Sequence, residues 1–312
     1  MKILITGGAG FIGSHLVRAL LKRGDAVRVL DNFFSGRRSN LAGLEAELIE
    51  GDIINAEVVK QALTGMTRVL HLAAVPSVPR SIADPLNSNA VNVVGTLNVL
   101  VAARDLGIQR VVLASSSSVY GEAFAGAKRE DLPLYPLSPY AVSKLAAEKY
   151  GAAFYTVYGL ETVALRYFNV FGPRQDPRSE YAAVIPKFIQ ALLAGRRPTI
   201  YGDGKQTRDF TYVENVVQAN LLALEAPSVA GQAFNIAAGN EISLNQLVRT
   251  LAEISGEDFQ PEYAAPRKGD IRHSVADISK ARQSLEYSPL VDFGEGLALT
   301  LQWYREHRDE LG

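Results

Sequence analysis

Two residues in this chain have the types and spacing needed for proton transfer to and from a hydroxyl group. Tyr140 and Lys144 stand four positions apart, directly after Pro139. Proline is favoured in the first turn of a helix, so we expect a helix here, and positions i and i+4 of a helix share one face. Free tyrosine has a pKa of about 10, whereas a general base works best near pH 7. A cation beside the phenol lowers that pKa, so Lys144 makes Tyr140 a candidate general base.

A run of hydroxyl side chains forms a second candidate group. Ser115–Ser118 directly follow the apolar segment Arg110–Ala114, which has the composition of a buried strand. Ligands of open α/β sheets bind beyond the carboxyl ends of the strands, so these hydroxyls are placed to bond a hydroxylated substrate. Taken alone, a Tyr–Lys pair is common on surface helices and serines are common in polar loops. A third motif, in the same chain, makes a catalytic role for both groups more convincing.

The third motif is the glycine-rich segment Gly7–Gly13, which fits both G-x-G-x-x-G and G-x-x-G-x-x-G. It lies between an expected strand and an expected helix, and this context favours a turn that binds a dinucleotide pyrophosphate. Asp31 ends the next expected strand, where an acid binds the ribose of the cofactor. Its charge favours NAD over a cofactor with a 2′-phosphate, although the nearby Arg37 and Arg38 soften that preference.

Short apolar runs alternate with helix-period segments through the first half of the chain, which predicts a parallel sheet with helices on both faces. The expected strands are Lys2–Thr6, Ala26–Leu30, Glu47–Glu50, Arg68–Leu72, Arg110–Ala114 and Glu161–Arg166. The expected helices are Gly13–Lys22, Ala56–Thr64, Asn87–Leu106, Pro139–Tyr158, Val213–Leu224, Ser243–Ile254 and Gly296–Arg305. We therefore expect an α/β protein with a Rossmann-type doubly wound parallel sheet in residues 1–170 and a smaller C-terminal substrate-binding lobe in residues 171–312. The chain is expected to pass back to the first lobe around residues 210–238.

Composition excludes several other classes. The 312 residues include no cysteine, which removes disulfide frameworks and cysteine-based metal sites, and a net charge of −1 argues against binding nucleic acid through bulk positive charge. The four histidines are not spaced as metal ligands, so no metal is expected. The first apolar run is too short for a signal peptide, and no stretch approaches the length of a membrane span. We expect a soluble cytoplasmic protein.

With these motifs in hand, the whole chain resembles the extended short-chain dehydrogenase/reductase family, and within it the nucleotide-sugar 4-epimerases. The segments that carry the resemblance are Thr6–Gly13, Asp31-Asn32, Gly51–Ile53, His71–Ala74, Ser115–Gly121, Tyr140–Lys144 and Arg166–Asn169. The resemblance implies NAD as the cofactor and a UDP sugar as the substrate. It also implies that Tyr140 is the catalytic base, that Lys144 binds the nicotinamide ribose and assists Tyr140, and that Ser116 holds the sugar 4-hydroxyl.

The resemblance further implies two sets of binding residues. Those expected to contact NAD are Gly7, Gly10, Phe11, Ile12, Asp31, Asn32, Ser35, Gly36, Asp52, Ile53, Leu72, Ala73, Ala74, Asn92, Tyr140, Lys144 and Tyr167. Those expected to contact the UDP sugar are Ser77, Ser116, Ser118, Asn169, Ala183, Val184, Tyr201, Arg208, Arg267, Asp270 and Ser274. Among these, Arg208 and Arg267 are expected to bind the diphosphate, because a guanidinium donates two hydrogen bonds to a phosphate.

Positions at which the subfamilies carry different residues indicate which activity within the family this chain has. Where 4,6-dehydratases carry Asp-Glu and UDP-glucuronate decarboxylases carry Glu, this chain has Ser117 and Ser118. Asn169 stands where UDP-glucuronate 4-epimerases usually have threonine. Ser274 stands where epimerases restricted to UDP-glucose and UDP-galactose tend to have tyrosine, and serine leaves space for a 2-acetamido group. Of the family, the bacterial UDP-N-acetylglucosamine 4-epimerases resemble the chain most. We expect interconversion of UDP-GlcNAc and UDP-GalNAc through a 4-keto intermediate, with UDP-glucose and UDP-galactose left open as further substrates.

Several alternatives remain open at this point. One is a UDP-glucose 4-epimerase with little N-acetyl activity, and Pro76, which replaces a glycine of close relatives, is a departure that could alter preference. A UDP-glucuronate 4-epimerase and a net nucleotide-sugar reductase or dehydrogenase are others. A remote alternative is an NAD-binding regulator, a class that tends to lose the Tyr–Lys pair. Finally, apolar residues on several faces of Asn87–Leu106 and Pro139–Tyr158 resemble helices of a four-helix interface, which implies a homodimer.

Overall fold

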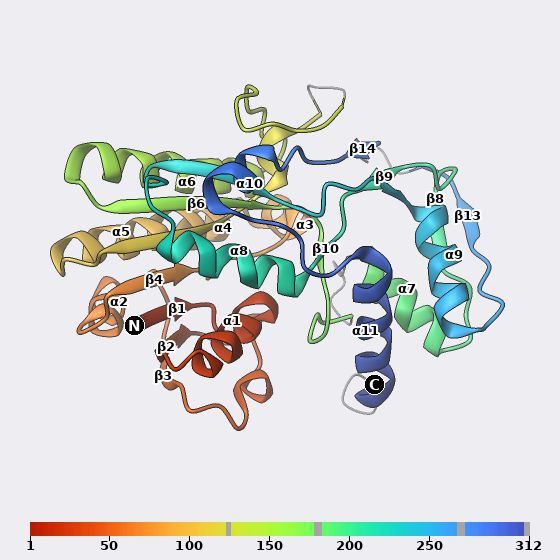
Figure 1. The fold of residues 1–312 in the computed structure, drawn as a ribbon, viewed down its shortest axis with the longest axis horizontal. Coiled ribbons are helices and arrows are strands. Elements are labelled where there is room, and N and C mark those ends of the chain that lie inside the picture. The colour runs from red at the N-terminus through yellow and green to blue at the C-terminus, as the bar shows by residue number, and fades with distance from the viewer. Residues whose placement is uncertain (123–125, 178–182, 267–271, 309–312) are drawn as a thin grey trace.

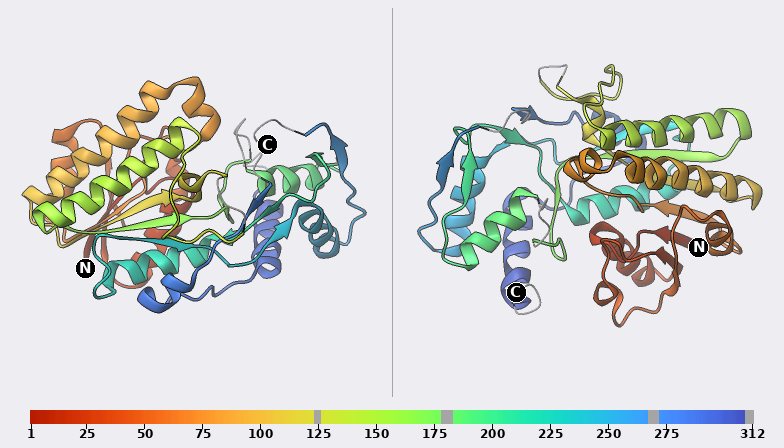
Figure 2. Two further views of the ribbon diagram at one scale, coloured as in Figure 1. Left: turned by 90° about the horizontal axis from the view of Figure 1, so that it is seen from above. Right: turned by 180° about the vertical axis from the view of Figure 1, so that it is seen from behind.

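A seven-stranded sheet, in which every neighbouring pair of strands is parallel, is the centre of the fold (Figures 1 and 2). The computed structural model describes residues 1–122, 126–177, 183–266 and 272–308. The strand order is β11-β6-β5-β4-β1-β2-β3. The strands are β1 (Lys2–Thr6), β2 (Ala26–Asp31), β3 (Glu47–Glu50), β4 (Arg68–His71), β5 (Arg110–Ser116), β6 (Glu161–Tyr167) and β11 (Gln232–Ile236). The order reverses between β1 and β4, which is the mark of a doubly wound sheet, so the predicted fold class is confirmed.

Helices cover both faces of this sheet because its strands are apolar on both sides. In β1, Ile3 and Ile5 enter one buried cluster while Leu4 enters another. The first cluster is covered by α1 (Phe11–Lys22), α8 (Val213–Glu225) and α10 (Ser279–Leu285). The second is covered by α2 (Ala56–Leu63), α5 (Thr96–Asp105) and α6 (Pro139–Tyr158). The expected helix at residues 139–158 has the predicted bounds, since the Ser138 side chain caps its start and Gly159, at φ 72°, ends it.

The single helix expected at residues 87–106 is instead three helical segments. They are α4 (Pro85–Asn89), a π-helical turn η2 (Ala90–Gly95) and α5. At Gly95 a side chain would come within 2.6 Å of Ile53, so the chain passes close to its neighbour there. By length and composition alone the run Pro85–Asp105 could cross a membrane, and 44% of its most apolar 18-residue window is buried within the protein.

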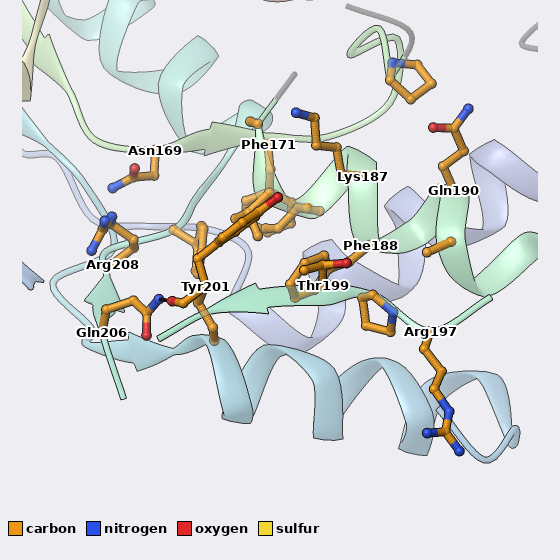
Figure 3. A pocket seen from close by; sticks show the side chains of 18 of the residues that line it. Asn169, Phe171, Lys187, Phe188, Gln190, Arg197, Thr199, Tyr201, Gln206 and Arg208 are labelled. Carbon is orange, nitrogen blue, oxygen red and sulfur yellow. Dashed lines mark hydrogen bonds between the residues drawn. The ribbon is translucent and has the colours of Figure 1, made fainter. Parts of the chain in front are cut away.

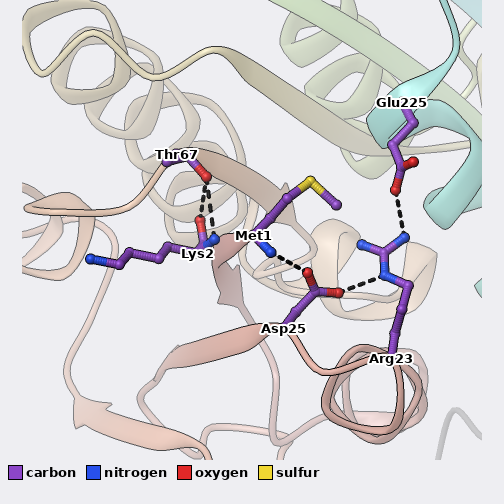
Figure 4. Close-up of polar contacts among 6 residues, drawn as sticks. All are labelled: Met1, Lys2, Arg23, Asp25, Thr67 and Glu225. Atoms are coloured by element: carbon purple, nitrogen blue, oxygen red, sulfur yellow. Dashed lines mark hydrogen bonds and ion pairs between the residues drawn. The ribbon is translucent and has the colours of Figure 1, made fainter.

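The chain returns to the sheet late in the sequence, through α8 and then β11, the seventh strand, which the sequence patterns did not reveal. β11 pairs with β6 in the register Gln232↔Val163 to Ile236↔Tyr167. Figure 4 shows how α8 is tied to α1: Arg23, which ends α1, donates to Asp25 and to Glu225 of α8, both at 2.6 Å. The division of the chain at residue 170 and its return to the first lobe around residues 210–238 stay predictions.

The remaining elements pack around a third apolar cluster, on the right of Figure 1. The helices there are α7 (Val184–Leu193), α9 (Leu244–Ser255) and α11 (Phe293–Glu306). The short strands are β7 (Val170–Phe171), β8 (Thr199–Tyr201), β9 (Thr207–Arg208), β10 (Thr211–Tyr212), β12 (Ile242–Ser243), β13 (Glu262–Ala264) and β14 (His273–Ser274). The other short helical segments of the fold are α3 (Val78–Ala83), η1 (Arg38–Leu41) and η3 (Ser117–Tyr120). Phe11 and Ile12 of α1 also pack against this cluster, so it joins the sheet at the end where the glycine-rich turn lies.

Candidate active site

A cavity of about 740 Å³ lies at the carboxyl ends of the strands, where the sheet order reverses. The chain turns to opposite faces after β1 and after β4, which leaves a cleft between the two connections. Of the residues predicted to bind NAD, all but Asn92 line this cavity. They are Gly7, Gly10, Phe11, Ile12, Asp31, Asn32, Ser35, Gly36, Asp52, Ile53, Leu72, Ala73, Ala74, Tyr140, Lys144 and Tyr167.

Two glycines of the glycine-rich turn, Gly7 and Gly13, stand where a side chain has no room. A Cβ on Gly13 would lie 2.1 Å from the carbonyl oxygen of Gly7, and a Cβ on Gly7, where φ is +73°, would lie 2.8 Å from the backbone nitrogen of Ala73. The turn therefore brings the start of α1 close to both β1 and the loop after β4. A bare backbone at a helix N-terminus supplies the N–H donors and partial positive charge that a pyrophosphate needs.

Asp31 is held with its carboxylate at the cavity wall. Oδ2 accepts a hydrogen bond from the backbone N–H of Ala9 at 2.9 Å, and Oδ1 accepts one from Phe33 at 2.8 Å. Burial raises the pKa of Asp31, and the two N–H donors act in the opposite direction. A carboxylate fixed beside the glycine turn suits the hydroxyls of a ribose and repels a 2′-phosphate.

The two arginines that softened the preference for NAD are paired with carboxylates. Arg37 forms an ion pair with Asp176, and Arg38 forms one with Glu50. The Arg38 guanidinium also lies 4.3 Å from the centre of the Phe33 ring. Both charges are therefore partly offset within the protein, and the residues present fit NAD better than its 2′-phosphorylated form.

Tyr140 and Lys144 both line the cavity, one turn apart on α6. The Lys144 Nζ lies 5.9 Å from the centre of the Tyr140 ring and donates a 3.0 Å hydrogen bond to the carbonyl oxygen of Ala114. Burial lowers the pKa of Lys144 to about 8, while the charge of Glu148 raises it. Burial raises the pKa of Tyr140, and the Ser116 side chain acts in the opposite direction. Lys144 alone therefore does not bring the Tyr140 pKa down to the range of a general base.

Asn92 lies behind the cavity wall rather than in it. Its Oδ1 accepts from the backbone N–H of Val75 at 2.8 Å, and its Nδ2 donates to Ser143 Oγ at 3.0 Å. Ser143 in turn donates to the carbonyl oxygen of Tyr140 at 2.8 Å. Asn92, from the π-helical turn, thus ties the loop after β4 to the first turn of α6, and its side chain is already used in doing so.

A second cavity, of about 810 Å³, adjoins the first, and Ala183 lines both. Predicted substrate residues that line it are Asn169, Ala183, Val184, Tyr201 and Arg208. Figure 3 shows Arg208 beside Asn169 and Gln206 at one end, Tyr201 across the middle and Arg197 at the far end. Asn169 has a φ of 29° and donates from Nδ2 to the carbonyl oxygen of Asp209 at 3.3 Å, which joins β6 and β7 to the strand that carries Arg208.

Four other predicted substrate residues, Ser77, Ser116, Ser118 and Ser274, line neither cavity. Ser77 caps α3, accepting from the N–H of Arg80 at 3.3 Å, and Ser116 accepts from the N–H of Ser118 at 3.2 Å. The Ser118 Oγ is buried and has no hydrogen-bond partner in the structure. Ser274 is partly buried on β14, in register with Arg208 of β9. The other two predicted residues, Arg267 and Asp270, lie outside the described residues.

The cavities also contain residues that the sequence motifs did not indicate. Arg80 and the run Arg174–Asp176 line the cofactor-sized cavity, and Lys187 and Gln206 line its neighbour. Arg174–Asp176 lie shortly after the Arg166–Asn169 motif, and this nearness is a signal that could have indicated them. Among the described residues, no group of three or more His, Asp or Glu side chains is placed to hold a metal ion.

The fold and the site together define a Rossmann-type enzyme that uses a dinucleotide. The chain belongs to the NAD dependent epimerase/dehydratase family, which it matches over residues 3–237. It is 42% identical to a UDP-glucose 4-epimerase of Mycolicibacterium smegmatis, over 98% of this chain and 99% of that protein.

Solved structures give the same family and more than one sugar. A UDP-N-acetylglucosamine 4-epimerase of Methanobrevibacter ruminantium, in complex with UDP-N-acetylmuramic acid, superposes with a TM-score of 0.94 at 42% identity, covering 98% of both chains. A UDP-glucuronic acid 4-epimerase of Bacillus cereus, in complex with UDP-glucuronic acid and NAD, has a TM-score of 0.91 at 36% identity, covering 98% of this chain and 99% of that one. The predicted family, the NAD cofactor and the UDP-sugar 4-epimerase class are confirmed, whereas the sugar is not determined.

Proposed function

We propose that this protein interconverts UDP-GlcNAc and UDP-GalNAc, with Tyr140 and Lys144 as its catalytic pair. The observation that carries the proposal is the pair's place in the cofactor-sized cavity, which shares the wall residue Ala183 with a second cavity that contains Arg208 and Tyr201. One cavity suits NAD and the other suits a nucleotide diphosphate. The reacting sugar then lies where the two meet.

The chain's own residues supply the proton transfers. The Tyr140 oxygen removes the proton of the sugar 4-hydroxyl and later returns it, and the Ser116 hydroxyl holds that sugar oxygen in line. NAD, held by the residues that line the cofactor-sized cavity, would supply reversible hydride exchange at C4 of the sugar and, in its oxidised form, a second positive charge. Lys144, fixed to Ala114, supplies the protein's cation. Together the two positive charges oppose the burial that raises the Tyr140 pKa.

The nucleotide stays fixed while the sugar presents both faces. Arg208 supplies a planar donor for the diphosphate and Tyr201 supplies a ring for the uracil, so that binding energy is concentrated on the part of the substrate that does not react. Few fixed contacts suit a ring that must turn between the two hydride transfers.

The N-acetyl preference rests on Ser274, whose short side chain shares the register of Arg208. In a parallel pair, residues in register lie on the same face of the sheet, so Ser274 is beside the arginine that lines the second cavity. A serine there leaves space that a tyrosine ring would fill. Asn169 favours an uncharged hexose over UDP-glucuronate, because UDP-glucuronate 4-epimerases usually have threonine at this position.

An assay of the purified protein with UDP-GlcNAc, UDP-GalNAc, UDP-glucose, UDP-galactose and UDP-glucuronate tests the proposal. We expect each N-acetylated sugar to convert to its 4-epimer, with no growth of NADH absorbance during turnover. Negligible turnover of the N-acetylated pair beside good turnover of UDP-glucose would overturn the preference. Stoichiometric NADH formation would instead identify a net dehydrogenase.

We also propose a cytoplasmic homodimer formed through α5 and α6. Both helices expose apolar side chains: Val101 on α5 is 38% exposed, and Val157 and Tyr158 on α6 are 68% and 53% exposed. An exposed apolar face of this kind is typical of a subunit interface. Size-exclusion chromatography with light scattering should give twice the mass of one chain, and a monomer at assay concentration would contradict the proposal.

A further inference from the structure

A buried ion pair lies behind Lys144, on the side away from the cofactor-sized cavity. Glu148 on α6 accepts from Arg166 on β6 through both carboxylate oxygens, with Oε1 at 3.0 Å from Nε and Oε2 at 2.9 Å from NH2. Both side chains are only 5% exposed. Removing two charges from water costs several kcal/mol per ion, so a pair at this depth persists only with good geometry and further hydrogen bonds.

Those further hydrogen bonds go to the two ends of the serine segment. Glu148 Oε1 accepts from the hydroxyl of Ser115, at the end of β5. Arg166 NH1 donates to the Tyr120 hydroxyl at 2.7 Å, and that hydroxyl donates to Asn235 Oδ1 of β11, also at 2.7 Å. The segment 115–120 is therefore attached at its first and last residues to the same ion pair. Ser116 lies between those attachments.

The same carboxylate acts on Lys144. Glu148 is one helical turn beyond Lys144, and its charge raises the Lys144 pKa against the burial that lowers it to about 8. The other titratable groups that face Lys144 are Tyr140 on α6 and His71 on β4. The pKa of His71 is lowered to about 3 by burial and by Lys144, so His71 is neutral near pH 7. The charged groups that face Glu148 from the other elements are Arg166 and, beyond it, Glu130 and Lys280, which line the same small cavity.

We propose that Glu148 and Arg166 form a positioning pair for catalysis, which fixes the serine segment that carries Ser116 and keeps Lys144 in its charged form. The proposal rests on the catalytic roles proposed above for Tyr140 and Lys144. It adds two residues that do not themselves contact the reacting sugar but act on two groups of the proposed catalytic machinery, Ser116 and Lys144.

Glu148→Gln tests the pair because it keeps the shape of the side chain and removes its charge. We expect kcat to fall at least about 10-fold while KM for the UDP sugar stays within about 3-fold, since the loss is in alignment and not in nucleotide binding. The alkaline limb of the kcat profile should move to lower pH by about one unit, because Lys144 loses the negative neighbour that raises its pKa.

Glu161→Gln is the matched control. Glu161, on β6, is also an arginine partner, at 2.6 Å from NH2 of Arg110 on β5, but it is 45% exposed and lies at the other end of β6 from the site. The control should keep the wild-type kcat and pH profile. An equal fall in kcat in both variants would identify a general effect of losing an ion pair and would overturn the proposal, as would a wild-type kcat and profile in Glu148→Gln.

Two further variants keep the test decisive. If Glu148→Gln does not fold, Ser115→Ala removes one of the carboxylate's hydrogen bonds without burying an unpaired charge, and it should lower kcat with an unshifted alkaline limb. A wild-type kcat in Ser115→Ala would then overturn the proposal. Tyr140→Phe separates this inference from the function: an active Tyr140→Phe variant means that the proposed function is wrong, whereas an inactive one beside a normal Glu148→Gln variant means that only the positioning pair is wrong.

Discussion

The ammonium group of Lys144 donates a 3.0 Å hydrogen bond to the carbonyl oxygen of Ala114, so a cation on α6 is fastened to the end of β5. Lys144 is only 7% exposed. A long side chain that is already fixed loses little further conformational entropy when ligands bind. The position of the cation relative to Tyr140 is therefore built into the protein before any substrate enters.

Replacing Tyr140 with phenylalanine removes the proposed base and leaves the ring. General acid–base groups contribute about 10²–10⁴-fold to the rate, so turnover should fall by at least about 100-fold. The cavity wall keeps its shape, so bound NAD, measured by its release on denaturation, should be unchanged. A variant within about 10-fold of the wild-type rate would contradict the role of Tyr140.

Replacing Ser274 with tyrosine should fill the space proposed for the 2-acetamido group. We expect kcat/KM for UDP-GlcNAc to fall at least about 10-fold more than kcat/KM for UDP-glucose, because overpacking penalises only the larger sugar. The two ratios are measured with the same enzyme preparation. Unchanged selectivity would remove Ser274 as a determinant of the preference.

Replacing Arg208 with glutamine should weaken nucleotide binding. A hydrogen bond to a charged group contributes about 1.5–3 kcal/mol, so KM for the UDP sugar should rise about 10- to 100-fold. Arg197→Gln is the control, since Arg197 lines the far end of the same cavity and is exposed (Figure 3). Equal effects of the two variants would show that Arg208 has no special role.

His71 should make stability depend on pH. Its Nδ1 and Nε2 lie 2.7 Å from Thr6 Oγ1 and 2.9 Å from Thr96 Oγ1, and burial, helped by the charge of Lys144, lowers its pKa to about 3. Unfolded histidine has a pKa of about 6.5, so between these values the unfolded state binds the extra proton. The contribution of neutral His71 to the free energy of unfolding is complete above about pH 6.5. Between about pH 6.5 and the folded pKa it falls by up to about 1.4 kcal/mol for each unit by which the pH decreases.

Urea unfolding between about pH 7 and pH 5 tests this dependence in the wild type and in His71→Gln. The unfolding free energy of the variant should decrease less between these pH values than that of the wild type. His15, whose pKa is lowered by burial to about 4, should account for part of the decrease that remains in the variant. An identical pH slope in the two proteins would mean that His71 is not held neutral by the fold.

The sequence predicted the elements whose patterns are local. The glycine turn, the six expected strands and the helix at residues 139–158 are all present, because each is set by periodicity, a cap or a proline. β11 was not predicted because it reaches the sheet only through tertiary pairing with β6. The π-helical turn was missed because its hydrophobic pattern is that of an ordinary helix.

In the site, too, local motifs could be predicted from the sequence and contacts set by tertiary packing could not. The predicted cofactor residues came from contiguous motifs, and almost all of them line one cavity. The link between Glu148 and Ser115 joins residues 33 positions apart, and that between Arg166 and Tyr120 joins residues 46 apart. Such contacts depend on how β5, β6 and α6 pack, which no local pattern specifies. Asn92 was assigned to the cofactor by resemblance, but its amide is used in fixing Val75 and Ser143.

The central claim is that C4 of a UDP-N-acetylhexosamine is inverted by removal and return of its own hydrogen. The direct measurement uses UDP-GlcNAc that carries deuterium at C4, incubated with the purified protein in ordinary water and analysed by NMR and mass spectrometry. We predict UDP-GalNAc that retains the deuterium at C4. Deuterium lost to the solvent, or no UDP-GalNAc while UDP-glucose is converted, would contradict the account.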